Sequence, residues 1–454
     1  MNRKLFGTDG VRGTANRHPM TAEIALALGQ AVAHVFRASG HERHRIIIGK
    51  DTRLSGYLFE NAMAAGICSM GGDVLLVGPM PTPGMAFLTA DMRCDAGVMI
   101  SASHNPYQDN GIKFFSRDGF KLADDIETRI EGLIATGALD GARAEPGEVG
   151  QAQRIDDALG RYVVFLKNSF PREYTLDGLR VVLDCANGAA YRVGPTVLQE
   201  LGAEVFSLGV APNGRNINEG YGSLHPERTV ARVREVRADL GIALDGDADR
   251  CLLVCENGQI IDGDALIALC AGDLVDRGLL RGGAVVATVM SNLGLQKALE
   301  RMGVDLVRTR VGDRYVVEAM RSGGFNLGGE QSGHIVFLDH NTTGDGLVTA
   351  LQALAIMRRT GRPISELVAG FQRFPQILVN VRVAEKRPFE EVPAVMEAVR
   401  KVEEELGDRG RVLLRYSGTE AKARVMVEGE DEARVREMAH DIAERVSRHL
   451  GAGA

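Results

Sequence analysis

The sequence predicts an α/β protein: three similar α/β domains with mainly parallel sheets, followed by a C-terminal α+β domain. Two observations predict this fold class. A pattern of strands alternating with helical segments occurs three times along the chain, which is typical of parallel sheets buried on both faces. The residues from 371 onwards follow a different pattern, in which strands flank a long charged helix.

Each repeat opens with a β-branched strand that runs into polar residues and then a helical pattern. These first strands are 45–51, 180–186 and 284–290. A second strand opens on a glycine in each repeat, at 72–77, 202–207 and 303–308. A third strand, such as 97–100, ends in a polar loop: SASHNP at 101–106, DGDADR at 245–250 or GEQSGH at 329–334. Because ligands of such sheets bind outside the carboxyl ends of the strands, we expect these loops to share a site.

The last segment predicts a strand at 376–383, a charged helix around 388–406, and strands at 411–414 and 425–428. The loop RYSGTE at 415–420 joins the last two strands. We therefore expect four domains that surround one central cleft and each contribute a loop to it. Their expected bounds are 1–154, 155–257, 258–370 and 371–454.

Length and composition agree with a soluble protein of several domains. A chain of 454 residues is longer than a single hydrophobic core supports. No apolar run approaches the roughly 18 residues of a membrane span, and residues 1–7 are too few and too polar for a signal peptide. We therefore expect a cytoplasmic protein without a membrane partner.

Charge and cysteine usage exclude further classes. The net charge of −7 and the lack of a basic cluster argue against a nucleic-acid partner. The six cysteines form no C-x-x-C pair and lie mostly in apolar runs, as reduced core thiols do. An anionic ligand would therefore need a local pocket of positive charge.

The DGDADR loop predicts a metal site. Asp245, Asp247 and Asp249 are spaced by two, so an extended segment would place their carboxylates on one face. Three such charges repel one another unless they share a cation, and hard oxygen ligands suit Mg²⁺. A solvated acidic turn is an alternative. An EF-hand is a weaker one, because Arg250 stands where that loop needs glycine.

The SASHNP loop presents Ser103 between Ala102 and a turn at 104–106. A serine hydroxyl is a poor nucleophile without a base or a metal, and serine is also a common helix cap. The residues alone leave nucleophile and cap equally open.

Two further loops are ambiguous when taken singly. GTDGVRG at 7–13 is rich in glycine, but it lacks the preceding strand and the lysine of a Walker loop. RYSGTE offers a guanidinium, two hydroxyls and a glycine, which suit either a phosphate cradle or a plain hairpin turn.

Together, in this order and spacing, the five motifs resemble the α-D-phosphohexomutase superfamily over essentially the whole chain. The resemblance implies an isomerase that interconverts glucosamine 6-phosphate and glucosamine 1-phosphate, on the route to UDP-N-acetylglucosamine and the cell wall. It also implies Mg²⁺, a phosphorylated Ser103, and glucosamine or glucose 1,6-bisphosphate as intermediate or activator. A mutase for glucose or mannose phosphates, a metal-dependent phosphatase and a sugar-phosphate binder are the alternatives, and a homodimer is left open.

The same resemblance assigns roles to individual residues. Ser103 would carry the phosphoryl group and, with the three aspartates, hold the metal. The residues implied to act on the reacting phosphate are Arg12, His104, Lys113 and Arg250. The residues implied to bind the sugar are Glu330, Ser332 and His334. The residues implied to bind the second phosphate are Arg415, Ser417, Gly418, Thr419 and Arg424, on a last domain that acts as a mobile lid.

The chain departs from the family pattern at two places. Residues 421–423 replace a proline and apolar residues after the RYSGTE loop, which leaves the rigidity of that loop in question. Asp313 stands where relatives acting on glucose or mannose phosphates often have histidine, which favours an amino sugar. Glu330 or Asp313 would then face the ammonium group.

Overall fold

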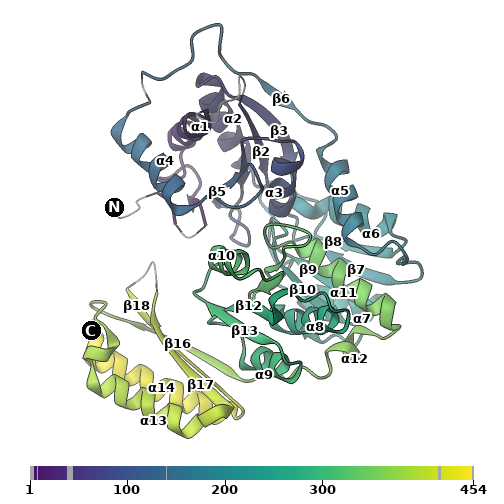
Figure 1. Cartoon of the computed structure of the whole chain (residues 1–454), viewed down its shortest axis with the longest axis vertical. Helices are drawn as coiled ribbons and strands as arrows, with labels where there is room; N and C mark the ends of the chain where they lie inside the picture. Colours follow the sequence, from purple (N-terminus) through teal and green to yellow (C-terminus); the bar gives the residue numbers. More distant parts are fainter. Residues whose placement is uncertain (1–4, 8, 38–43, 140, 418–420, 452–454) are drawn as a thin grey trace. The chain divides into compact units, whose positions relative to one another are not determined.

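The computed structural model describes residues 5–7, 9–37, 44–139, 141–417 and 421–451. They form two compact units (Figure 1). The first comprises Met1–Thr288 and Val307–Ala369, and the second comprises Val289–Leu306 and Gly370–Ala454.

The first sheet of the larger unit is mixed, with strand order β1-β5-β4-β2-β3-β6. Its strands are β1 (Val11–Thr14), β2 (Arg45–Lys50), β3 (Asp73–Pro79), β4 (Ala96–Ile100), β5 (Asp109–Ser116) and β6 (Ala152–Arg154). The strands β4, β2, β3 and β6 run parallel, while β5 pairs antiparallel with β4 and β1 pairs antiparallel with β5.

Helices cover both faces of this sheet. They are α1 (Ala22–Arg37), α2 (Gly56–Ser69), α3 (Thr82–Asp91) and α4 (Asp124–Thr136). Residues of α1, α2 and α4 share a core with Ile46 and Ile48 of β2. The helix α3 packs on the opposite face, where a Cβ on Gly97 would meet the Thr89 hydroxyl at 2.0 Å. Glycine at position 97 therefore lets α3 approach the sheet closely.

The second sheet has the order β11-β10-β9-β7-β8. Its strands are β7 (Arg180–Asp184), β8 (Glu204–Leu208), β9 (Leu240–Leu244), β10 (Cys251–Cys255) and β11 (Ile260–Ile261). Its helical segments are α5 (Ala158–Ser169), η1 (Ala189–Tyr191), α6 (Val193–Glu200) and α7 (Glu227–Val236). The central strands β8, β7 and β9 are parallel, and β10 returns antiparallel to β9.

The third sheet has the order β13-β12-β14-β15. Its strands are β12 (Ala284–Thr288), β13 (Asp305–Thr309), β14 (Leu327–Gly329) and β15 (Ile335–Phe337). The helical segments along this part of the larger unit are α8 (Gly263–Asp276), η2 (Arg281–Gly283), α10 (Asp313–Gly323), α11 (Gly346–Thr360) and α12 (Ile364–Val368). The strands β12 and β14 are parallel, and β15 is antiparallel to β14.

The same arrangement surrounds each polar loop. SASHNP leads from β4 to β5, DGDADR from β9 to β10, and GEQSGH from β14 to β15, and each pair is antiparallel. The predicted α/β class is confirmed, but each loop returns into a strand of its own sheet and not into a helix. Both ends of every loop are therefore fixed by ladder hydrogen bonds.

The second unit is an antiparallel sheet with helices. Its strands are β16 (Gln376–Arg382), β17 (Gly410–Tyr416) and β18 (Lys422–Gly429), in the order β16-β18-β17. Its helical segments are α9 (Leu293–Arg301), η3 (Phe389–Glu391), α13 (Pro393–Leu406), η4 (Gly407–Arg409) and α14 (Glu432–Leu450). The predicted helix around 388–406 begins at Pro393, a residue suited to the first helical turn, after the short turn η3. Valines from β18 and α13 share one core with α14.

Among the described residues, no helix combines the length and the apolar character that a bilayer crossing requires. Five of the six cysteines are buried and Cys68 is partly exposed, all as free thiols.

Candidate active site

Ser103 lies in the loop between β4 and β5 and is 2% exposed. No helix follows it, because the chain continues into β5, so Ser103 does not cap a helix. Its φ of +52° is in the left-handed region, which is unusual for a residue with a Cβ atom. The loop therefore holds this serine in a conformation that the chain would not adopt by itself.

The Ser103 hydroxyl faces the second predicted loop. Its Oγ donates to Asp245 Oδ2 at 2.5 Å and lies 3.2 Å from His104 Nδ1. The two loops meet closely because a Cβ on Gly246 would come within 2.6 Å of the Ser103 carbonyl oxygen. The serine and the first aspartate, 142 positions apart in sequence, are thus direct neighbours.

The three aspartates converge, although not as the sequence analysis expected. Their nearest carboxylate oxygens lie within 4.8 Å of one another. The segment is a turn and not an extended strand, since Ala248 has a φ of +57°. The turn, and not the alternation of an extended segment, brings the carboxylates together.

Buried carboxylate oxygens without partners mark the place where a cation fits. Asp247 Oδ2 accepts from Lys113 Nζ at 2.9 Å and from Thr82 Oγ1 at 2.6 Å. Its Oδ1 atom, and that of Asp249, have no hydrogen-bond partner. Buried polar atoms are normally satisfied, so these two oxygens fit a bound metal ion.

The pKa values of the aspartates also indicate that a cation fits among them. Burial raises the pKa of Asp245, and the charges of Asp249 and Asp247 raise it further. Burial alone would also raise the pKa of Asp247, but Lys113 and the hydrogen bonds from Thr82 and Lys113 hold it below its usual value. A shared divalent cation would relieve the repulsion that Asp245 experiences.

Positive groups from two strands surround this cluster. Lys113 on β5 lies 3.4 Å from Asp9 and 3.5 Å from Asp249, and these carboxylates with Asp247 raise its pKa against the effect of burial. Arg12 on β1 contacts Asp9, and its pKa is raised by Asp9 and Asp247 although burial opposes this. Both residues predicted from the family resemblance are therefore close to the aspartates and positively charged.

His104 differs from these cations. Burial and the charge of Arg250 lower the pKa of His104 to about 4. Its imidazole is therefore neutral near pH 7 and can accept or relay a proton at Ser103.

The third loop joins the cluster through a residue that the sequence analysis missed. Lys121 contacts both Asp9 and Asp313, and Asp313 Oδ2 lies 3.5 Å from His334 Nε2. Burial would raise the pKa of Asp313, but Lys121 lowers it below its usual value. Asp313 is therefore already neutralised by a lysine.

Glu330 acts electrostatically on one of the predicted reaction groups, Arg250. Its charge, after those of Asp249 and Asp245, raises the pKa of Arg250 against the effect of burial. Glu330 Oε1 accepts from the Gly312 backbone at 3.2 Å. Ser332 Oγ and both ring nitrogens of His334 are buried without a hydrogen-bond partner, so the third loop also carries unsatisfied polar atoms.

The predicted phosphate residues lie in the second unit. Arg415 and Arg424 stand directly opposite each other on β17 and β18. Burial and the charge of Arg424 lower the pKa of Arg415, and Arg424 Nε is buried without a hydrogen-bond partner.

The loop between these two strands is closed by a backbone hydrogen bond. The Ser417 backbone donates to the Lys422 carbonyl at 2.8 Å, which closes the hairpin despite the changed residues at 421–423. Gly418 and Thr419 lie outside the described residues.

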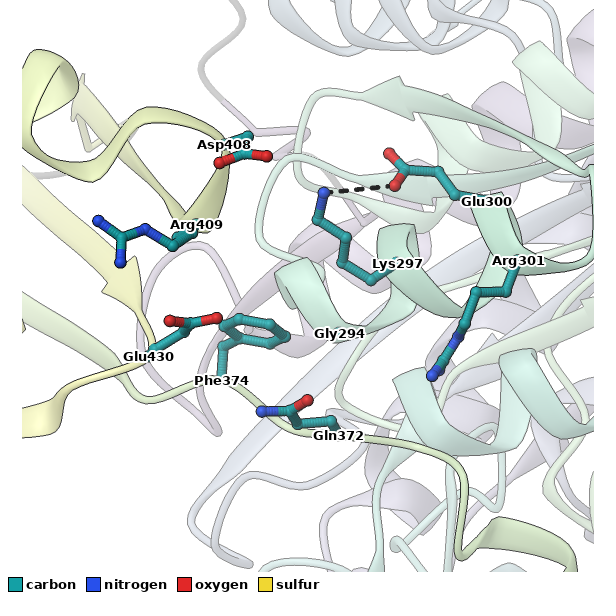
Figure 2. Close-up of a pocket in the computed structure, with 9 residues that line it drawn as sticks. All are labelled: Gly294, Lys297, Glu300, Arg301, Gln372, Phe374, Asp408, Arg409 and Glu430. Carbon is teal, nitrogen blue, oxygen red and sulfur yellow. Dashed lines mark ion pairs between the residues drawn. The ribbon is translucent and has the colours of Figure 1, made fainter.

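The second unit also holds a pocket of about 520 Å³ beside α9 (Figure 2). Figure 2 shows Lys297 paired with Glu300, 3.4 Å apart, across from Asp408 and Arg409. The side chains that line this pocket carry charges of both signs, and none of the predicted site residues is among them. The arginine pair is therefore the better anion site in this unit.

The residues that the sequence analysis missed share one property. Asp9, Thr82 and Lys121 act through partners that are distant in sequence, such as Asp247 and Asp313. Asp9 could have been identified from the sequence, because it stands inside the GTDGVRG motif. Thr82 and Lys121 stand in no motif, so nothing in the sequence singled them out.

Comparisons with known proteins give the family. The phosphoglucomutase/phosphomannomutase domains I, II, III and C-terminal match residues 3–140, 160–258, 262–374 and 378–445. The phosphoglucosamine mutase of Syntrophotalea carbinolica is 62% identical over 451 residues, with 99% of each chain covered. That of Myxococcus xanthus is 58% identical over 449 residues, covering 99% of this chain and 98% of the relative.

Solved structures agree on the fold. A phosphoglucomutase/phosphomannomutase family protein from Burkholderia thailandensis has a TM-score of 0.81 at 24% identity, with 97% of each chain covered. The Aspergillus fumigatus N-acetylphosphoglucosamine mutase in complex with GlcNAc-6P and magnesium has a TM-score of 0.65 at 19% identity, covering 98% of this chain and 96% of that one. The resemblance seen in the five motifs is thus confirmed: the protein belongs to the phosphoglucomutase/phosphomannomutase family of α-D-phosphohexomutases, which are isomerases.

Proposed function

We propose that the protein interconverts glucosamine 6-phosphate and glucosamine 1-phosphate by transferring a phosphoryl group between Ser103 and the sugar. The observation that carries this proposal is the buried Ser103 hydroxyl, 2.5 Å from Asp245 and next to three converging carboxylates. The names of the full-length relatives support the amino-sugar substrate.

The proposed reaction consists of two successive phosphoryl transfers. A sugar hydroxyl attacks phosphoserine 103, so that the P–Oγ bond breaks, a P–O bond to the sugar forms, and glucosamine 1,6-bisphosphate results. After this intermediate turns around, Ser103 Oγ attacks its other phosphate, so that the phosphoserine forms again and the P–O bond from that phosphorus to the sugar breaks. The sugar oxygen leaves as a hydroxyl and takes up a proton equivalent to the one that Ser103 loses. Asp245 Oδ2 and His104 Nδ1 both lie within hydrogen-bond distance of Ser103 Oγ. Either group can therefore accept the proton that Ser103 loses when its hydroxyl attacks the phosphate.

The carboxylates of Asp245, Asp247 and Asp249, together with the phosphate on Ser103, would hold Mg²⁺. When bound, the ion neutralises charge on the transferring phosphoryl group. Magnesium accompanies GlcNAc-6P in the Aspergillus fumigatus relative, and another structure of that protein contains glucose 1,6-bisphosphate. The neighbouring carboxylates raise the pKa values of Lys113, Arg12 and Arg250 against the effect of burial, which suits all three to stabilise negative charge as cations.

We place the non-reacting phosphate at Arg415, Ser417 and Arg424, with Gly418 and Thr419 in the same loop. Like charges directly opposite each other on neighbouring strands are unfavourable, and an anion bound to both arginines removes that repulsion.

Arg415→Ala should therefore raise KM strongly, because charge-assisted bonds to the bound phosphate are lost. The expected loss is about 2–4 kcal/mol of binding free energy, or roughly 30-fold or more in KM. Steady-state kinetics with glucosamine 1-phosphate measure this change. Arg400→Ala, which removes an exposed arginine on α13, is the matched control and should leave KM unchanged. An unchanged KM in Arg415→Ala would place the phosphate elsewhere.

Glu330 is the better candidate for the substrate ammonium group, since Asp313 is already paired with Lys121. A carboxylate built to face an ammonium should favour glucosamine over glucose phosphate by roughly 2–3 kcal/mol, or about 30- to 150-fold in kcat/KM. We would measure kcat/KM for glucosamine, glucose and mannose 1-phosphates at equal bisphosphate and Mg²⁺. Glu330→Gln should reduce this discrimination.

The same assay separates the alternatives. Equal or better use of glucose or mannose phosphate would contradict the amino-sugar assignment and favour a phosphoglucomutase or phosphomannomutase. Release of inorganic phosphate without an isomerised sugar would identify a phosphatase.

A further inference from the structure

Arg53 is fully buried in the turn after β2, and its side chain holds the Ser103 loop. Its Nη2 atom donates to the Ser103 carbonyl at 2.9 Å and to the Asn105 carbonyl at 2.8 Å. Its Nη1 atom donates to the Pro106 carbonyl at 2.5 Å. One guanidinium thus binds three backbone carbonyls of a single loop.

The partner of Arg53 holds the same loop from its other side. Arg53 Nε donates to Asp51 Oδ2 at 2.8 Å, and the Ser101 hydroxyl donates to that same oxygen at 2.7 Å. Ser101 Oγ in turn accepts from the Ser103 backbone N–H at 2.9 Å. The Asp51–Arg53 pair therefore fixes both the N–H and the C=O of Ser103, one through Ser101 and the other directly.

This arrangement explains how Ser103 keeps its left-handed backbone. A residue with a Cβ atom adopts a φ of +52° only where its surroundings impose that conformation. Asn218 Nδ2 adds a second donor to the Ser103 carbonyl at 2.9 Å and to the Asn105 carbonyl at 3.0 Å. The conformation in turn aims Ser103 Oγ at Asp245 Oδ2.

We infer that Arg53, paired with Asp51, is a positioning residue that sets the place of the Ser103 hydroxyl during phosphoryl transfer. The role rests on the proposed function, since it serves the transfer assigned to Ser103. It requires arginine, because a lysine ammonium cannot present the planar fork of donors that binds three carbonyls and a carboxylate together.

The test is Arg53→Lys, compared with wild type in three measurements. The kcat should fall by about 100-fold, as expected when a reacting atom is misplaced by about 1 Å, while KM stays within about twofold. Phosphorylation of Ser103 by glucose 1,6-bisphosphate, followed by mass spectrometry in a single turnover, should slow by the same factor. Backbone amide exchange of residues 101–106 should be faster than in wild type. In Arg53→Ala, added guanidinium should restore part of the lost kcat.

Arg411→Lys is the matched control. Arg411 also binds a carboxylate, Glu428, and two backbone carbonyls, those of Val289 and Ser291, but it belongs to the second unit. We expect both variants to lose thermal stability. In Arg411→Lys, however, the amide exchange of residues 101–106 and the rate of Ser103 phosphorylation should stay at the wild-type values. If the two variants behave alike, Arg53 is only structural and the inference is wrong.

A milder variant covers the case in which Arg53→Lys does not fold. Asn218→Ala removes the Asn218 donor to the Ser103 and Asn105 carbonyls and leaves the Arg53 donors in place, so kcat should fall by about tenfold with the fold kept. Unchanged amide exchange in 101–106 in a folded Arg53→Lys would overturn the inference whatever the activity. Where Arg53→Lys does not fold, unchanged exchange in 101–106 together with an unchanged kcat in Asn218→Ala would overturn it. If wild-type protein neither phosphorylates Ser103 nor isomerises the sugar, the proposed function is wrong. The amide-exchange measurement does not depend on turnover, so it tests the structural part of the inference separately.

Discussion

Ser103→Ala is expected to lower kcat by at least about 10⁴-fold, because the covalent route through phosphoserine is then closed. The fold should remain, since alanine keeps the Cβ atom and loses only one buried hydroxyl. The measurement is the isomerisation rate with glucosamine 1-phosphate and added bisphosphate, together with intact-mass detection of the phosphorylated chain. Wild-type protein should gain one phosphoryl group and the variant none.

Ser69→Ala is the control for this experiment. Ser69 is half-buried, and its hydroxyl donates to the Gly66 carbonyl on α2, outside the site. We expect wild-type kcat and normal phosphorylation in this variant. A Ser103→Ala enzyme with the wild-type rate would exclude the phosphoserine mechanism.

Removal of Mg²⁺ by a chelator should abolish turnover, and added Mg²⁺ should restore it. Asp247→Asn should lower kcat and raise the Mg²⁺ concentration for half-maximal activity, each by about 100-fold or more, because one charged ligand is lost. Asp247 is the informative position: Lys113 and Thr82 occupy its Oδ2, which leaves Oδ1 for the ion.

A second readout of metal binding does not need activity. Mg²⁺ should raise the melting temperature of the wild-type protein and have little effect on Asp247→Asn. Asp239→Asn removes a carboxylate that accepts from the Arg180 backbone at the start of β7, outside the metal cluster, and should behave as wild type in both assays. If Asp247→Asn keeps the wild-type metal dependence, the DGDADR loop is only a solvated acidic turn.

The sequence predicted the fold class and the loops because both depend on local patterns. Apolar strands such as 97–100 and the polar segments after them can be identified without any knowledge of tertiary contacts. The position of such loops at the carboxyl ends of strands follows from how parallel sheets bind ligands. The convergence of Asp245, Asp247 and Asp249 was predicted, but the turn at Ala248 that produces it was not.

Contacts between segments that are distant in sequence could not be predicted from such local patterns. Lys121 bridges Asp9 and Asp313, which lie 112 and 192 positions away, so no short motif contains the interaction. Arg53 stands in a polar stretch that was recognised as the end of a strand, yet its role depends on a loop about 50 positions further on. The pairing of β2 with β4 brings Arg53 to its loop, and contacts between loops of different sheets bring Lys121 to Asp313. A single lysine or arginine in the sequence does not reveal either.

The return of each polar loop into its own sheet has a consequence for the turnaround of the reaction intermediate. A loop anchored at both ends, at Ile100 and Ile112 or at Leu244 and Cys251, has little freedom to follow a ligand that reverses its orientation. These loops act as a stationary frame, with the attacking oxygen and the acidic cluster fixed in place. In the proposed mechanism the bisphosphate therefore pivots against that frame, and its near symmetry, with a phosphate at each end of one ring, lets a single set of groups act on both halves of the cycle.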